Sequence, residues 1–256
     1  MLKFEELKIF LDEKADQYNN PGFIENDPIQ IPHRFTLKQD IEIAGFLAAT
    51  ISWGNRKAII QSAEKMLDIM GNSPYDFVMN HSENDLRQIK DRSMHRTFNG
   101  EDFIYFVEQF NRIYQEHESL EGLFKIDDSE TNFLHAIERF RSRFLGTEKH
   151  RSHKHVSSPY KNSSTKRIIM FLRWMVRKDK RGVDFGIWEN IDQKHLSIPL
   201  DVHTGNISRK LGLISRTQND WKTVEELDIV IRKFDNKDPA KYDFALFGLG
   251  VTKELL

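Results

Sequence analysis

Residues 164–175 read STKRIIMFLRWM, and this stretch decides the fold class. Side-chain types that favour helix caps occupy positions 162–165, and a largely apolar run follows Lys166. The pattern predicts a helix over 166–177 whose first residue is a lysine. A lysine at that end is electrostatically disfavoured, because the helix dipole there attracts anions.

The same helical spacing of apolar residues recurs on both sides of this stretch. Residues 101–115, EDFIYFVEQFNRIYQ, place apolar side chains at steps of three and four, which is typical of an amphipathic helix. Further helices are predicted over 40–53, 57–70, 131–145, 224–234 and 239–249. No segment shows the sustained alternation of a sheet, and the nineteen phenylalanines are expected to fill the core. We therefore predict an all-α protein.

The composition excludes several classes of site. The chain of 256 residues contains no cysteine, which excludes disulfides, thiolate zinc sites, cysteine-ligated iron–sulfur clusters and cysteine nucleophiles. His150, His153 and His155 lack the i, i+4 spacing of a helical metal pair, so we expect no metal and no cofactor. No apolar run reaches the roughly 20 residues of a membrane span, and the first residues do not form a secretory signal. These features favour a protein of a reducing cytoplasm.

Charge is unevenly distributed along a chain whose net charge is −1. Residues 1–30 carry seven acidic and three basic side chains, whereas residues 139–181 carry fourteen Lys or Arg and only two acidic residues. Such a basic segment fits an anionic partner, and phosphate chains are the commonest one. A solvated basic loop explains it equally well. The polar stretch 146–165 is predicted to be a long loop between two bundles of helices.

Two residues are candidates for catalysis. Because Arg167 and the helix dipole both disfavour a cation at Lys166, its amine is a candidate nucleophile, and the alternative is an ordinary surface lysine. Asp201 lies in PLDVHTGNISRKLGL, residues 199–213, at a predicted helix start. It is either an N-cap or a carboxylate that stabilises a cation or activates a water. His203, two residues further on, is interpreted from the sequence as a packed or capping histidine.

A third group of candidates lies where the apolar helix 40–53 ends. Trp53, Asn55 and Arg56 bring an aromatic ring, an amide and a guanidinium to one turn. Such a group could stack on a nucleic-acid base and hydrogen-bond to it. A structural turn around a buried tryptophan is the alternative.

Together these segments resemble a known superfamily. STKRIIMFLRWM followed by PLDVHTGNISRKLGL is similar to the lysine–aspartate core of helix-hairpin-helix (HhH-GPD) DNA glycosylases, in which a lysine opens a helix and an aspartate stands in a V-D-T-H-type turn. The longer gap between the two is nearer in pattern to the archaeal oxidised-guanine glycosylases. Nearly the whole chain also resembles an uncharacterised bacterial family that is assigned to this superfamily by similarity. Further segments that carry this resemblance are AGFLAATISWGNRKAI (44–59), VDFGIW (183–188) and FALFGLGV (244–251).

The resemblance implies a role for each candidate. Lys166 takes the place of the nucleophilic lysine that attacks the anomeric carbon of a flipped nucleotide, forming a Schiff base that permits strand cleavage by β-elimination. Asp201 takes the place of the essential carboxylate that stabilises the sugar cation. Trp53, Asn55 and Arg56 fall in the region of the base pocket or duplex wedge. Residues implied to contact the nucleic acid are Lys161, Ser163, Ser164, Thr165, Arg167 and His203.

The chain departs from the superfamily at its hairpin. The family pattern L-P-G-V-G grips phosphate through backbone amides, whereas the equivalent stretch here, VSSPYKNSSTK (156–166), contains Pro159 and no glycine. The hairpin is therefore either rebuilt or degraded. The iron–sulfur cysteines of endonuclease III are also absent, as they are in many relatives.

The resemblance also implies two intertwined helical lobes with a cleft between them. We expect one lobe over about 40–160 and the other from 1–39 together with 161–256. The leading hypothesis is a base-excision repair glycosylase, with or without AP-lyase activity, that acts on a damaged base, such as an oxidised one, in duplex DNA. It would require neither a membrane nor an obligate protein partner. The alternatives are a catalytically inactive nucleic-acid-binding relative and a helical scaffold whose basic loop binds an acidic protein.

Overall fold

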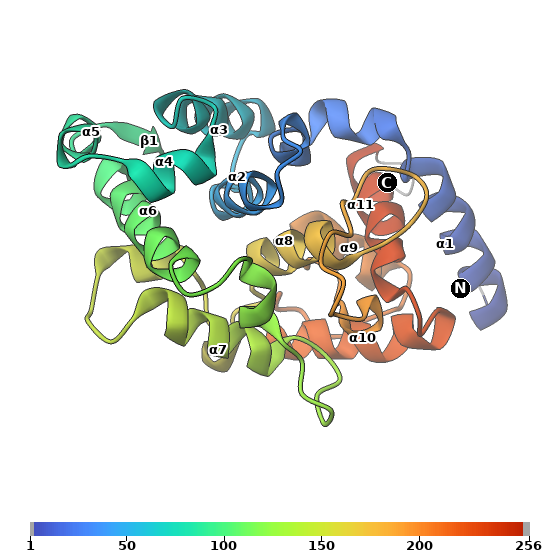
Figure 1. Cartoon of the computed structure of the whole chain (residues 1–256). Coiled ribbons are helices and arrows are strands. Elements are labelled where there is room, and N and C mark those ends of the chain that lie inside the picture. Colours follow the sequence, from blue (N-terminus) through green and yellow to red (C-terminus); the bar gives the residue numbers. More distant parts are fainter. Residues whose placement is uncertain (1–2, 253–256) are drawn as a thin grey trace. The chain divides into compact units, whose positions relative to one another are not determined.

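The computed structural model describes residues 3–252, which are predominantly helical (Figure 1). The α-helices are α1 (Phe4–Tyr18), α2 (Lys38–Thr50), α3 (Arg56–Ile69), α4 (Pro74–Asn80), α5 (Glu83–Ile89), α6 (Gly100–Tyr114), α7 (Leu134–Leu145), α8 (Lys166–Val176), α9 (Val202–Lys210), α10 (Trp221–Phe234) and α11 (Tyr242–Thr252). Strands β1 (Ser93–His95) and β2 (Phe98–Asn99) form a small antiparallel hairpin. The prediction of an all-α fold class is confirmed.

Short 3₁₀ turns connect several of these helices. They are η1 (Pro21–Asn26), η2 (Pro28–Gln30), η3 (Pro32–Arg34), η4 (Leu120–Phe124), η5 (Arg151–His155), η6 (Pro159–Lys161), η7 (Gln193–His195) and η8 (Pro239–Lys241). Five of them, η1, η2, η3, η6 and η8, begin with a proline, because the first position of a helix does not use the N–H that proline lacks. The predicted loop 146–165 therefore contains two short helical turns, η5 and η6.

The described residues divide into two compact units. Unit 1 comprises the described residues of Met1–Phe23, Ile126–His135 and Ser158–Leu256, and unit 2 comprises Ile24–Lys125 and Ala136–Ser157. These bounds differ from the expected lobes in two places, since residues 24–39 group with unit 2 and residues 126–135 group with unit 1. Residues 28–34 belong to unit 2 because η2 and η3 pack against α2.

Within unit 1, the first helix packs along the last (Figure 1). The Tyr18 ring occupies the space that a side chain at Gly248 would need, so glycine permits the close approach of α1 and α11. Tyr242 Oη also donates a hydrogen bond of 2.8 Å to Asp12 Oδ1. The buried face of α1 consists of Leu7, Leu11 and Ala15.

Arg173 of helix α8 and Arg177, which follows the helix directly, are buried in unit 1. All residues of α8 from Ile168 to Val176 are buried. Arg173 forms ion pairs with Asp184, at 3.1 Å, and with Asp243. Because a buried guanidinium is stable only when it is neutralised and hydrogen-bonded, Arg173 has a structural role in this core.

The VDFGIW turn, residues 183–188, closes the C-terminal end of α8. Its carboxylate, Asp184, also accepts a hydrogen bond of 3.0 Å from Arg177 Nη1. Phe185 N donates to Trp174 O at 2.8 Å, which joins the turn to the last turn of the helix. The purpose of this turn, which the sequence did not reveal, is to supply one shared counter-ion to two buried arginines.

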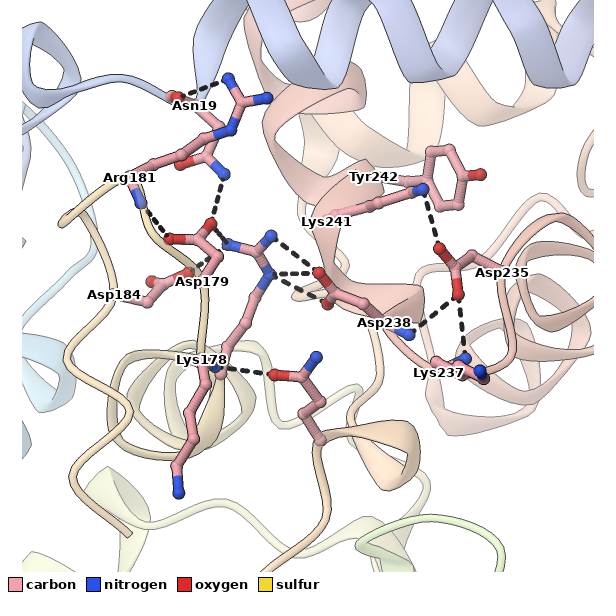
Figure 2. Close-up of polar contacts among 12 residues, drawn as sticks. Asn19, Lys178, Asp179, Arg181, Asp184, Asp235, Lys237, Asp238, Lys241 and Tyr242 are labelled. Atoms are coloured by element: carbon pink, nitrogen blue, oxygen red, sulfur yellow. Dashed lines mark hydrogen bonds and ion pairs between the residues drawn. The ribbon is translucent and has the colours of Figure 1, made fainter. Parts of the chain in front are cut away.

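Further carboxylates surround this network, as Figure 2 shows. Asp179 accepts from Asn19 Nδ2 at 2.7 Å and from Arg181 N at 2.9 Å. Asp238 accepts from Arg177 Nη2 at 2.8 Å. Charged hydrogen bonds thus link the end of α1, the end of α8 and the segment that precedes α11.

Unit 2 is built around phenylalanine rings. Phe46 of α2 lies 5.6 Å, ring centre to ring centre, from Phe110 of α6 and 5.3 Å from Phe144 of α7. Phe140 of α7 stacks on Phe124 at 4.2 Å. Aromatic pairs at these distances add to the stability that burial alone provides. This packing places the hydrophobic core of unit 2 between α2, α6 and α7.

The structure contains several elements that the sequence pattern did not predict, namely α1, α4, α5 and the β1–β2 hairpin. Over residues 3–252, no helix combines the length and the apolar character that crossing a bilayer requires.

Candidate active site

Helix α8 begins at Lys166, after a turn with two left-handed residues. Asn162, the residue that follows turn η6, has a φ of 60°, and Thr165, the N-cap of α8, has a φ of 44°. Glycine is the usual residue at such positions, and a β-branched residue there is strained. The turn before Lys166 therefore reaches left-handed geometry without a glycine.

Thr165 is almost completely buried, with an exposed fraction of 1%. Its N–H donates to Ser163 Oγ at 3.2 Å, whereas its hydroxyl has no hydrogen-bond partner among the described residues. An N-cap threonine normally uses its hydroxyl to accept a bond from the first turn. The left-handed backbone at Thr165 is accompanied by the loss of this capping bond.

Asp201 is the N-cap of α9 and has an extended backbone. Its Oδ1 accepts a hydrogen bond of 2.9 Å from Thr204 N, as the capping interpretation predicts. Its other oxygen, Oδ2, lies 3.8 Å from Lys166 Nζ. The two interpretations of Asp201 are therefore compatible, because each carboxylate oxygen has a different partner.

The Lys166–Asp201 pair is accessible to solvent. The side chains are 29% and 21% exposed, respectively. A direct charge-assisted hydrogen bond measures about 2.7–2.9 Å, so the separation of 3.8 Å marks an ion pair that is not a tight hydrogen bond. The structure brings together the two residues that the sequence singled out, although they are far apart in the chain.

A buried carboxyl of α11 is electrostatically coupled to this pair. Burial raises the pKa of Asp243 to about 6, the Arg173 cation opposes that shift, and the negative charge of Asp201 adds to it. Helix α11 also packs against α9. The two helices are close at Gly250, where an added Cβ would lie 2.9 Å from the His203 Cβ.

The remaining candidates near Lys166 differ in accessibility. Lys161 and His203 are exposed. Burial lowers the pKa of the Arg167 guanidinium to about 10, and its side chain is only partly exposed. Ser163 and Ser164 bond within the protein, since Ser163 accepts from Thr165 N and Ser164 Oγ donates to Leu200 O at 3.4 Å. Hydroxyls of this turn therefore stabilise its conformation.

The three candidates at the other turn belong to unit 2. Asn55 is the N-cap of α3, with its Oδ1 accepting from Ala58 N at 3.1 Å, and Arg56 is the first residue of that helix. The Trp53 indole stacks on His155 at 5.8 Å and meets the His95 ring edge-on at 5.1 Å. The Asn55 bond caps a helix, and the Trp53 contacts are ring packing within unit 2. A role of the three residues in binding a nucleic acid stays a prediction.

The basic segment 139–181 is partly neutralised by carboxylates of the protein itself. Six of its arginines form ion pairs, and they are Arg141, Arg143, Arg151, Arg173, Arg177 and Arg181. Arg151, for example, pairs with the fully buried Asp102 at 2.7 Å. The exposed positive charge that is left belongs mainly to lysines, among them Lys149, Lys154, Lys161, Lys178 and Lys180. The net charge of the segment therefore overstates the charge offered to a partner.

Sequence reasoning missed three polar residues that surround the pair, namely Asn162, Asn219 and Asp220. Asn219 and Asp220 precede a predicted helix, and this position is a signal for capping. Nothing in the spacing indicates that they also bond to the turns of Lys166 and Asp201. Among the described residues, no cluster of three or more acidic or histidine side chains could hold a metal ion.

Comparison with known proteins places the chain in a family. No curated protein and no solved structure matches the chain. Residues 27–252 match the model of a protein family that is described as a protein of unknown function (DUF2400). This match spans all of unit 2 except its first three residues, together with most of unit 1. The chain therefore belongs to the DUF2400 family of proteins of unknown function.

Proposed function

We propose that the protein is a base-excision DNA glycosylase of the helix-hairpin-helix type that removes a damaged base by means of Lys166 and Asp201. The observation that carries the proposal is the separation of 3.8 Å between Lys166 Nζ and Asp201 Oδ2, with both side chains open to solvent. An amine beside a carboxylate at the surface is the arrangement that lysine-dependent base removal requires. The helix-hairpin-helix architecture and DNA as the partner are parts of the same proposal.

The proposed chemistry assigns a separate task to each group. After the Lys166 ammonium gives a proton to water, its amine attacks C1′ of the nucleotide, a C1′–N bond forms, and the glycosidic bond breaks. The base leaves with the bonding electrons and takes up the proton that the attacking amine releases through Asp201. The proton released by the amine passes to Asp201, whose carboxylate also stabilises the positive charge that develops on the sugar. Opening of the sugar ring then yields the Schiff base on Lys166.

The turn before Lys166 supports a rebuilt hairpin. Asn162 and Thr165 both have left-handed backbones, and this is the geometry for which glycine is favoured. In the proposal they take the place of the two glycines of the superfamily pattern. The exposed Lys161 on this turn would contact phosphate, which contributes affinity without reading sequence.

Borohydride trapping on duplexes with defined lesions, including an abasic site, tests the proposal. The expected result is a covalent protein–DNA adduct that is absent in Lys166→Ala. Lys233→Ala is the matched control, because Lys233 is an exposed lysine of unit 1 on α10, and it should trap as the wild type does. Absence of an adduct on every lesion would reject the lysine mechanism.

Two further outcomes identify the alternatives. DNA binding that weakens with salt but yields no chemistry, and that Asp201→Asn does not alter, indicates a non-catalytic nucleic-acid-binding protein. Absence of DNA binding at low salt favours a scaffold for an acidic protein.

A further inference from the structure

Two consecutive residues, Asn219 and Asp220, bond to the two turns that present Lys166 and Asp201. They lie in the connection between α9 and α10, and Asp220 is the N-cap of α10. Neither residue belongs to the turn of Lys166 or to the turn of Asp201. We refer to Asn219 and Asp220 together as the 219–220 clamp.

Asn219 holds the Asp201 side. Its Nδ2 donates a hydrogen bond of 3.0 Å to the backbone oxygen of Asp201. Its Oδ1 accepts from Arg209 Nη2 at 2.6 Å, which fixes the orientation of the amide. A side chain at Gly205 would come within 2.6 Å of that same oxygen, so glycine leaves the space that the Asn219 amide occupies.

Asp220 holds the Lys166 side. Its Oδ2 accepts a hydrogen bond of 3.0 Å from Asn162 Nδ2, and the Asn162 backbone oxygen accepts from Trp221 N at 3.3 Å. Asn162 is the left-handed residue that follows η6, four positions before Lys166. The side chain and the backbone of Asn162 therefore attach the turn of Lys166 to the start of α10.

The clamp is itself firmly anchored. Asp220 accepts from Arg216 Nη2 at 2.7 Å and caps Thr223 N at 3.0 Å. Although burial opposes the shift, hydrogen bonds from Arg216, Thr223 and Asn162 lower the pKa of Asp220 to about 2. The carboxylate is therefore charged throughout the neutral range. Consecutive Cα atoms are held about 3.8 Å apart by the peptide unit, and the bonds from Arg209 and Arg216 orient the two side chains, so the two attachment points are held near one another.

We propose that the 219–220 clamp positions Lys166 against Asp201 by tying both of their turns to one rigid dipeptide. Asn219 and Asp220 are positioning residues, since their bonds reach the backbone of Asp201 and the side chain of Asn162. The expected effect of the clamp on activity rests on the proposed function. Its effect on the distance between Lys166 and Asp201 does not. A displacement of about 1 Å between reacting groups can cost about a hundredfold in rate, so a clamp of this kind would govern activity.

Two variants each weaken the attachment of one turn. Asn162→Gly deletes the bond to Asp220 and keeps the left-handed backbone, because glycine adopts positive φ without strain. Asn219→Ala deletes the bond to the Asp201 backbone. Asn72→Gly is the matched control for the first variant, since Asn72 is another left-handed asparagine, with φ of 53°, in unit 2.

Zero-length cross-linking with a carbodiimide measures the geometry without any need for substrate. The reagent activates the Asp201 carboxyl, the Lys166 amine attacks it, and an amide forms while the reagent takes up the water and leaves as a urea. Mass spectrometry then gives the yield of the Lys166–Asp201 link. The internal reference is the link between Lys241 and Asp235, an ion pair of 2.8 Å in unit 1 with similar exposure.

The expected result is a several-fold lower ratio of the Lys166–Asp201 link to the reference link in Asn162→Gly and in Asn219→Ala. Asn72→Gly should keep the wild-type ratio. An unchanged ratio in both clamp variants, or absence of the Lys166–Asp201 link in the wild type, overturns the proposal. Loss of the reference link would reveal that Asn219→Ala fails to fold. In that case Asn162→Gly alone tests whether the clamp positions Lys166 against Asp201.

Borohydride trapping under single-turnover conditions then separates this inference from the proposed function. Each clamp variant should slow trapping about tenfold or more without a matching loss of DNA affinity. The double variant should be little slower than either single variant, because release of one turn already frees the pair. If cross-linking falls in the clamp variants and the wild type forms no adduct with DNA, the positioning role of the clamp is retained and the glycosylase proposal is rejected. Adduct formation at the wild-type rate in both clamp variants retains the glycosylase and rejects the clamp.

Discussion

Lys166 and Asp201 meet through one carboxylate oxygen only, because the second oxygen of Asp201 caps helix α9. Asp201 thus combines a structural bond to Thr204 with a charge next to the amine. Substitutions that keep one of these contributions and remove the other can separate them.

Asp201→Asn should separate capping from charge. Asparagine caps helices about as well as aspartate, so the free energy of unfolding should change by less than about 0.5 kcal/mol, whereas Asp201→Ala should lose about 1 kcal/mol. Both variants should lose adduct formation with DNA, because neither retains the charge beside Lys166. Urea unfolding and borohydride trapping measure the two effects. Wild-type trapping by Asp201→Asn would exclude a role for the carboxylate charge.

Thr165→Val should leave the protein as stable as the wild type or stabilise it by about 1 kcal/mol. The Thr165 hydroxyl is buried without a partner, and replacing such a group by an apolar group of the same shape removes a desolvation cost. Valine keeps the β-branched shape, so the strain of the left-handed backbone is unchanged. Thermal unfolding measures the effect. A loss of more than about 1 kcal/mol would show that the hydroxyl makes a bond in solution.

The pH dependence of stability should include a contribution from Asp228. Burial raises the pKa of Asp228 from 3.8 to about 6, although Arg232 and Ser197 oppose the shift. The native state therefore holds this proton more tightly than the unfolded state. The resulting stability is fully present below a pH of about 4 and is lost as the pH rises through about 6, and it amounts to about 3 kcal/mol.

Asp228→Asn abolishes this titration. Urea unfolding at a series of pH values measures the free energy of unfolding of both proteins. As the pH rises from about 4 to about 7, the wild type should lose about 3 kcal/mol of stability relative to Asp228→Asn. Parallel pH profiles for the two proteins would contradict the expectation.

Asp184→Asn should be strongly destabilising. The side chain is fully buried and is the counter-ion that Arg173 and Arg177 share. Removing one member of a buried ion pair typically costs about 3–5 kcal/mol. Glu83→Gln is the matched control, since Glu83 pairs with Arg87 at the surface, and its effect should stay below about 1 kcal/mol. Equal urea midpoints for the two variants would show that the network contributes little.

The sequence was sufficient to predict much of the helical fold. Apolar spacing identified most of the longer helices, because burial of one face dominates their energetics. It did not identify α4 and α5, which are only seven residues long. Helix α1 was missed because its charged residues obscure a stripe of only three buried side chains.

The candidate site was predicted in part. Lys166 was recognisable because a lysine is electrostatically disfavoured at a helix start, and Asp201 because it stands at a predicted helix start. The structure places Lys166 Nζ 3.8 Å from Asp201 Oδ2. Their attachment to Asn219 and Asp220 depends on tertiary hydrogen bonds, which no local pattern encodes. The internal pairing of the basic segment could not be predicted for the same reason, since the partners of Arg151 and Arg181 are Asp102 and Asp16, far away in the sequence.

The packing of α1 on α11 has a consequence for how the chain acquires its structure. Asp12 and Tyr242, which share a hydrogen bond, are 230 positions apart, so α1 finds its partner only after α11 has been synthesised. Contacts of such long sequence separation form late, because closing a long loop costs entropy before the contact stabilises anything. Until α11 emerges from the ribosome, the apolar face of α1, formed by Leu7, Leu11 and Ala15, therefore lacks the helix against which it packs. A chain that ends before α11 would leave this face exposed to water.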